Sequence, residues 1–148
     1  MTAKEYLRRI RDTESDLRSA EQDYQRVRDD VMNLKAIQYD KDKVSNSHIG
    51  DLSDAIAALD KYAERVNAKW DELIVLRTEA EELIGEIADG RYRDVLHRHY
   101  LQGESWEYIA VGMGYTYHHI HKLHGQALNE FEAVFLKNGY KRTQRSVL

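Results

Sequence analysis

The residues best suited to contact a polyanion lie toward the C-terminal end of this 148-residue chain. Residues 91–148 carry six of the seven histidines and a charge balance of +3, whereas residues 1–90 have a balance of −7. Lysine, arginine, histidine, tyrosine and threonine side chains bind phosphates and base edges when they are exposed. The two balances predict two modules with different partners, and nucleic acid is a candidate partner of the second.

Three helices are predicted to position these side chains. Apolar residues at helical spacing predict a helix over 91–101, a short helix from Trp106 to Met113, and a third helix that continues at least through Phe135. Ser105 and Thr116 are suitable N-caps, because their hydroxyl groups accept hydrogen bonds from free backbone N–H groups.

The second and third helices have the spacing of a helix-turn-helix. Ala110 is small where the two helices must approach closely, and Gly114 can adopt the positive φ of a tight turn. Ile120 and Leu123 would then lock the third helix onto the second, leaving its opposite side for duplex DNA. A helical packing module that does not bind DNA is the alternative. Gly139 is predicted to end the third helix.

The exposed sides of the first and third helices supply the predicted DNA contacts. Tyr117 can stack or hydrogen-bond, the histidines can contact base edges or phosphates, and Lys122 can reach guanine acceptors or a phosphate. Arginines of the first helix can bind flanking phosphates, although each also fits a solvated surface. The predicted DNA-binding residues are Thr116, Tyr117, His118, His121, Lys122, Arg91, Arg93 and Arg98.

Residues 91–131 resemble the fourth conserved region of bacterial sigma factors. The similarity is carried by Ser-Trp-Glu-x-Ile-Ala at 105–110, Met-Gly-Tyr at 113–115 and Leu-His-Gly-x-Ala-Leu at 123–128. More closely, the segment resembles small phage and prophage proteins that use this module, such as late-gene regulators of the ArpU and RinA types. The resemblance implies promoter-like recognition of a duplex by the helix that follows Thr116.

The same resemblance implies base contacts by Tyr117, His118 and Lys122 and a phosphate contact by His121. Sigma factors favour Arg, Glu and Gln at these positions, so the DNA sequence that is read would differ from theirs. Arg98 and His99 also stand where the family often has an apolar residue followed by Arg. This departure is expected to weaken core packing or to shift a backbone contact.

The acidic part of the chain is predicted to form two long helices. Heptad stripes of apolar residues run from Ala3 to about Gln38 and from Leu52 to Ile87. A polar loop is expected over residues 39–50, with Asp51 or Ser53 capping the second helix and Asp89-Gly90 ending it. Ile56, Trp70 and Ile84 widen the second stripe. A wide apolar face predicts that the antiparallel hairpin packs against another copy of the chain.

The composition predicts an all-α fold, with a long, coiled-coil-like N-terminal helical hairpin followed by a helix-turn-helix domain. The chain has no proline and no cysteine, and Ala, Leu, Glu, Lys and Arg favour helices. The expected domains are 1–90 for oligomerisation, 91–139 for DNA binding and 140–148 as a basic flexible tail. We expect no membrane association, because no apolar stretch is long enough to span a bilayer, and we expect a location in the cytoplasm of a bacterial host cell.

The histidine cluster invites a metal site, but the sequence does not complete one. His118 and His121 are one helical turn apart, yet no cysteine or patterned carboxylate supplies the remaining ligands of a zinc site. His124 lies beside the apolar stripe and is expected to be partly buried and hydrogen-bonded. No phosphate-cradling glycine loop, nucleophile elbow or zinc-protease signature is present, so we expect no enzyme, no metal and no cofactor.

These observations lead to one functional hypothesis and two alternatives. The hypothesis is a homodimeric transcriptional regulator, encoded by a phage or prophage, that binds double-stranded DNA sequence-specifically. One alternative is a DNA-packaging recognition subunit of the small-terminase type. The other is a protein-interaction module that binds host machinery, with RNA polymerase as a candidate partner. The DNA target, the number of subunits and the choice between activation and repression are not given by the sequence.

Overall fold

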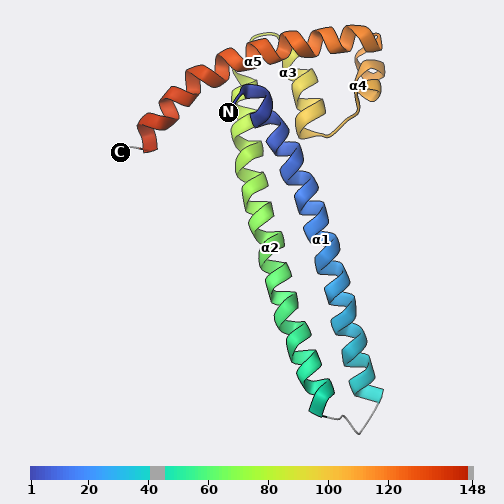
Figure 1. The fold of residues 1–148 in the computed structure, drawn as a ribbon. Coiled ribbons are helices and arrows are strands. Elements are labelled where there is room, and N and C mark those ends of the chain that lie inside the picture. The colour runs from blue at the N-terminus through green and yellow to red at the C-terminus, as the bar shows by residue number, and fades with distance from the viewer. Residues whose placement is uncertain (41–45, 147–148) are drawn as a thin grey trace. The chain divides into compact units, whose positions relative to one another are not determined.

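The computed structural model describes residues 1–40 and 46–146, and every element over these ranges is helical. The elements are α1 (Ala3–Asp40), α2 (Asn46–Gly85), α3 (Gly90–Leu96), the π-helix η1 (His97–Leu101), α4 (Trp106–Met113) and α5 (Tyr117–Ser146) (Figure 1). The predicted all-α class is therefore confirmed for the described residues. None of the helices in these ranges is long and apolar enough to cross a membrane.

The chain forms two compact units. Unit 1 contains residues 1–12 and 73–148, and unit 2 contains residues 13–72. In unit 2, α1 and α2 run in opposite directions (Figure 1), and Lys69 Nζ lies 3.6 Å from Asp16 Oδ2. The heptad stripe predicted for α1 is buried here at Leu17, Ala20 and Val31, which are 3–4% exposed.

Unit 1 joins the first turns of α1 and the last turns of α2 to the helices that follow. Tyr6 of α1 packs its ring against Phe131 and Phe135 of α5, with ring centroids 6.3 and 5.2 Å apart. The Tyr6 hydroxyl donates to Glu79 Oε2 of α2 at 3.1 Å. Phe131 is fully buried, so this aromatic group ties α5 to the N-terminal turns of α1. Burial of each such large side chain contributes roughly 1.5–3 kcal/mol.

The boundaries of α2 differ from the prediction at both ends. The helix begins at Asn46, so Asp51 and Ser53 lie inside it and neither is its N-cap. It ends at Gly85, and Asp89 instead caps α3 by accepting a hydrogen bond from Arg91 N at 2.9 Å. Local turn signals were misassigned here because Asp and Gly suit a helix start as well as a helix end. Of the predicted loop 39–50, residues 41–45 lie outside the described residues.

The predicted end of the last helix at Gly139 is also wrong, since α5 continues to Ser146. Among the described glycines only Gly103 and Gly114 have positive φ, so Gly139 does not adopt the left-handed conformation of a helix end. A glycine inside a helix costs only about 1 kcal/mol, which the neighbouring turns can offset.

A π-helical segment interrupts the predicted helix 91–101. The backbone N–H of Gln102 donates to the carbonyl of His97 at 3.0 Å, a bond that spans five residues. The wider turn buries three consecutive side chains, His99, Tyr100 and Leu101, which are 9%, 3% and 2% exposed. Single π-helical turns of this kind often occur at functional sites.

Candidate functional site

The connection between α4 and α5 is fixed by three local features that the sequence predicted. Ser105 Oγ accepts a hydrogen bond from Tyr108 N at 3.2 Å and so caps α4. Gly114 ends that helix with φ 73°, a conformation that disfavours any residue with a side chain. Thr116 Oγ1 then accepts from His119 N at 3.1 Å and caps α5.

Side-chain packing sets which side of α5 remains accessible. Ile109 and Ala110 of α4 are buried, as are Ile120 and Leu123 of α5, and α4 packs directly on α5. Because these four residues face the interior, the residues on the opposite side of the first two turns of α5 must face outward.

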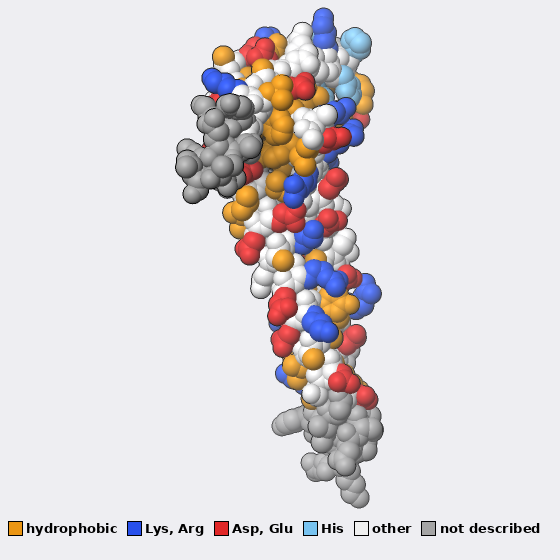
Figure 2. Space-filling model, turned by 60° about the vertical axis from the view of Figure 1, so that its left-hand side comes forward, with side chains coloured by type: hydrophobic (Ala, Val, Ile, Leu, Met, Phe, Trp, Pro, Cys, Tyr) orange, Lys and Arg blue, Asp and Glu red, His pale blue; other side chains and the backbone are white. Residues whose placement is uncertain are grey.

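Five of the predicted contact residues are exposed at the start of α5, and His118 and Lys122 are the two that lie opposite the buried side. Tyr117 is 52% exposed. Figure 2 shows histidine side chains on the surface of unit 1 near lysine or arginine side chains. The other four are exposed as well: Thr116, His118, His121 and Lys122. The first turns of α5 therefore present hydroxyl, imidazole and ammonium groups together.

Two of the predicted arginines are engaged at the junction between α2 and α3. Arg91 is exposed and forms a two-point ion pair with Asp89, at 3.0 Å between Nη2 and Oδ2. The hydrogen bond from the Arg91 side chain lowers the pKa of Asp89. Arg93 Nη1 donates to the carbonyl of Ala88 at 2.8 Å and also to that of Ile87. Arg93 therefore satisfies backbone acceptors between α2 and α3.

Arg98 also forms its contacts within the protein. Its Nε lies 3.0 Å from Glu104 Oε2, and both side chains are less than a quarter exposed. The guanidinium group covers Gly112 of α4 so closely that a Cβ at that position would lie 2.7 Å from Nη1. Arg98 thus links η1, the following loop and α4, and a Cβ at position 112 would displace the end of the Arg98 side chain.

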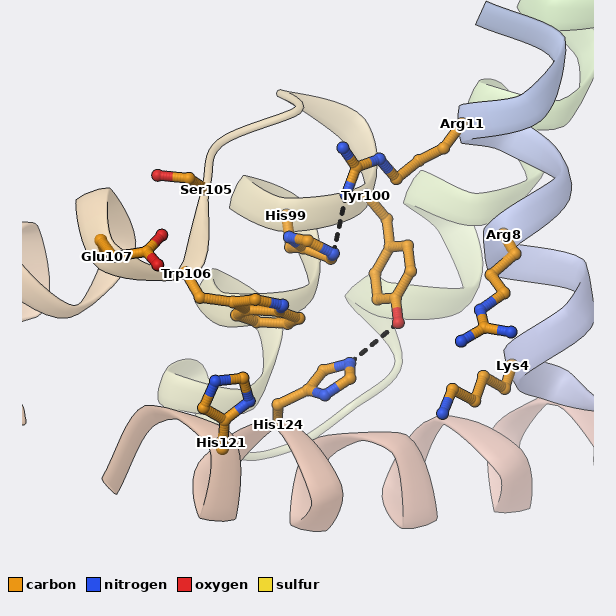
Figure 3. Close-up of a pocket in the computed structure, with 10 residues that line it drawn as sticks. All are labelled: Lys4, Arg8, Arg11, His99, Tyr100, Ser105, Trp106, Glu107, His121 and His124. Carbon is orange, nitrogen blue, oxygen red and sulfur yellow. Dashed lines mark hydrogen bonds between the residues drawn. The ribbon is translucent and has the colours of Figure 1, made fainter. Parts of the chain in front are cut away.

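His99 is a buried polar residue at the centre of the cluster shown in Figure 3. Arg11 Nη1 lies 2.8 Å from His99 Nε2, and His99 Nδ1 lies 3.0 Å from the carbonyl oxygen of Glu104. A guanidinium only donates and a carbonyl only accepts, so these two partners select the neutral tautomer with the proton on Nδ1. Burial lowers the pKa of His99. Its ring stacks on Trp106 at 3.7 Å between centroids, so His99 is packed within the core.

His124 is partly buried and hydrogen-bonded, as the sequence predicted. Its Nε2 lies 2.8 Å from the hydroxyl of Tyr100, and its ring lies 4.3 Å from that of Trp106. Burial, reinforced by His99 and Lys4, lowers the pKa of His124 to about 4. His124 is therefore neutral at pH 6–7, so its ring adds no positive charge to the surface of α5 in that range.

No group of three histidine, aspartate or glutamate side chains could hold a metal ion among the residues that the structure describes. Three of the histidines, His99, His121 and His124, instead lie beside the ring of Trp106. His121 lies 5.4 Å from Trp106 and 4.4 Å from Tyr117 between ring centroids. It thus connects the interior cluster to the exposed turns of α5.

Sequence reasoning missed the basic residues of α1 that approach this cluster. Lys4, Arg8 and Arg11 follow one another at spacings of four and three residues, so they share one side of α1. That spacing was visible in the sequence. Their proximity to His99 and Tyr100, about 90 residues away in the chain, depends on tertiary packing.

Comparison with known proteins identifies no relative. No protein-family model matches the chain, and neither the curated proteins nor the solved structures gave a match. The resemblance to the sigma-factor module therefore stays a prediction that rests on the motifs quoted above.

Proposed function

We propose that this protein is a sequence-specific DNA-binding transcriptional regulator, in which residues 91–139 act as a helix-turn-helix domain. In this proposal α4 lies across the duplex backbone and the first turns of α5 enter the major groove. The observation that carries it is the exposure of Tyr117, His118 and Lys122 on a helix whose other side is locked into the core.

The roles of the side chains follow from their surroundings. His118 and Lys122 lie one turn apart on α5 and have the reach and chemistry to contact base edges. Tyr117 and His121, in edge-to-face contact, would bind nearby phosphates or stack. Of the three predicted arginines, Arg91 is the exposed one. Arg93 and Arg98 would act by positioning α3, η1 and α4 rather than by touching DNA.

The proposed regulator acts as a dimer through its N-terminal helical hairpin. Ile56 and Trp70 of α2 are 39% and 44% exposed, and they are two heptads apart on the same side of the helix. A second copy of the chain that covers them would pair two DNA-binding domains. A dimer would bind two half-sites of a duplex at once. A single domain with few base contacts would bind one half-site weakly.

The test is a selection of duplexes from a random pool, followed by gel-shift titration at fixed salt. Replacement of both contact residues (His118→Ala with Lys122→Ala) should weaken binding to the selected duplex roughly tenfold or more, because each base contact is worth about 1–3 kcal/mol. The free energy of unfolding should change by less than about 0.5 kcal/mol, because both side chains are exposed.

The matched control also changes two exposed polar residues of α5, farther along the helix (Asn129→Ala with Lys137→Ala). This variant should bind the selected duplex as the unmodified protein does. Equal weakening in the two variants would show that net charge, rather than the first turns of α5, governs binding. Failure to select any duplex would refute the proposal outright. Light scattering of the same preparation should give the mass of a dimer, and a ring of eight or more copies would favour the packaging-subunit alternative.

A second candidate function is supported by the exposed face of α4. Tyr108 and Val111 lie three residues apart on that helix and are 64% and 83% exposed. Large apolar side chains that are this accessible are common at sites of protein contact. A protein-interaction module would bind its partner there, and Val111→Ser, which adds no charge beside the duplex, would weaken that binding more than it weakens binding to DNA.

A further inference from the structure

A cavity of about 580 Å³ lies in unit 1 between the first turns of α1 and the helices that carry the histidine cluster. Its volume falls within the usual range for sites that hold small molecules. Residues of η1, α4 and α5 form the remaining walls, and Trp106 and Tyr100 supply the aromatic surface (Figure 3). The cavity is thus a pocket lined by four elements, unlike the convex surface on α5 proposed for DNA.

Positive charge dominates this cavity. Lys4, Arg8 and Arg11 all line it, whereas Glu107 is its one acidic lining residue among those described. In Figure 3 the charged ends of Lys4 and Arg8 point toward Tyr100 and His124. Neither of these two cations forms an ion pair within the described part of the chain. Three like charges on one side of a helix repel one another, so a bound anion would relieve an unfavourable arrangement.

The cavity also holds ordered hydrogen-bonding groups. Arg11 is held by its hydrogen bond to His99, and the hydroxyl of Tyr100 is held by His124. Arginine and lysine side chains bind phosphoryl groups, arginine through two parallel hydrogen bonds and lysine as a point charge. Fixed partners reduce the conformational entropy that such groups lose when a ligand binds.

We propose that this cavity is a binding site for a phosphorylated small molecule, whose phosphoryl groups are held by Lys4, Arg8 and Arg11. The inference does not depend on DNA binding by α5. The phosphate groups of a nucleic-acid backbone have the same chemistry and are the alternative ligand for these cations. The structure favours a free ligand, because the cations line one wall of a concave pocket whose other walls come from η1, α4 and α5.

The test uses the full chain, with Trp106 as the reporter. The chain has two tryptophans, so Trp70→Phe leaves Trp106 as the only one. Pyrophosphate should change its fluorescence saturably, and calorimetry should give one site per chain. Citrate, which carries carboxylates in place of phosphoryl groups, should bind at least tenfold more weakly. An absence of saturable binding of pyrophosphate at millimolar concentration would overturn the proposal, and so would tighter binding of citrate.

Two double variants in the Trp70→Phe background distinguish binding at a specific site from nonspecific attraction to the positive charge of the protein. Lys4→Gln with Arg8→Gln should weaken pyrophosphate binding at least tenfold. Arg28→Gln with Lys35→Gln removes the same charge from exposed positions of α1 outside the cavity and should change the affinity less than twofold. Equal weakening in the two would mean nonspecific attraction and would overturn the proposal.

Measurement of duplex DNA binding by the same variant shows whether the bound phosphoryl group belongs to a free ligand or to a nucleic acid. Unchanged duplex binding by the Lys4→Gln, Arg8→Gln variant, together with lost pyrophosphate binding, would support a free ligand. Competition between pyrophosphate and duplex, with a parallel loss of both in that variant, would assign the cations to a nucleic-acid backbone and refute the free-ligand inference. This arm is independent of the His118 and Lys122 test, so the two proposals can fail separately.

Discussion

The burial of His124 makes a specific prediction about stability and pH. Its folded-state pKa of about 4 lies below the ordinary value of 6.5 because burial disfavours the charged ring. Well above pH 6.5 the ring is neutral in both the folded and the unfolded chain, so its titration does not change stability there. Between pH 6.5 and 4 the unfolded chain binds a proton that the folded chain does not, so stability falls as the pH falls.

The size of the effect follows from the same pKa shift. At pH 5 the unfolded ring is almost fully charged, and the difference from the folded ring corresponds to about 1–2 kcal/mol of lost stability relative to pH 7.5. The assay is urea denaturation followed by circular dichroism at several pH values from 7.5 to 5. Asp89 and Glu5, whose pKa values are lowered by hydrogen bonds, titrate mainly below this window.

Two variants isolate the contribution of His124. His124→Gln can keep a hydrogen bond to Tyr100 but cannot titrate, so its stability should depend less on pH by about 1–2 kcal/mol over the same window. His118→Gln, at an exposed position on the same helix, should keep the full dependence. A residual slope is expected in His124→Gln because burial also lowers the pKa of His99. If His124→Gln and the unmodified protein lose the same stability between pH 7.5 and 5, the reasoning is refuted.

Two further predictions concern the packing of unit 1 and are measured by urea denaturation at pH 7.5. Phe131→Ala should reduce the free energy of unfolding by about 3–5 kcal/mol, because the ring is fully buried between α1 and α5; a loss below about 1 kcal/mol would contradict that packing. Gly114→Ala should cost about 1–2 kcal/mol because its φ is 73°. Gly125→Ala, inside α5 with open space around the position of the added Cβ, should be neutral or slightly stabilising.

The parts of the fold that were predicted correctly depend on short stretches of sequence. Ser105, Gly114 and Thr116 each act on backbone groups within four residues, so their side-chain chemistry alone placed the limits of α4 and the start of α5. The inward residues of these helices also followed from helical periodicity. The ends of α2 and α5 were misplaced because aspartate and glycine are compatible with more than one local conformation.

The sequence by itself therefore determined the all-helical class, the α4–α5 junction and the set of side chains exposed on the first turns of α5. Tertiary structure decided the rest, since it depends on contacts between distant residues. The π-helical turn buried His99 against Trp106 and selected its tautomer through Arg11 and Glu104. Packing also committed Arg98 to Glu104 and brought Lys4 and Arg8 to a cavity lined by residues about a hundred positions away. Periodicity reports which side of a helix is buried, but it carries no information about which distant side chain will be its neighbour.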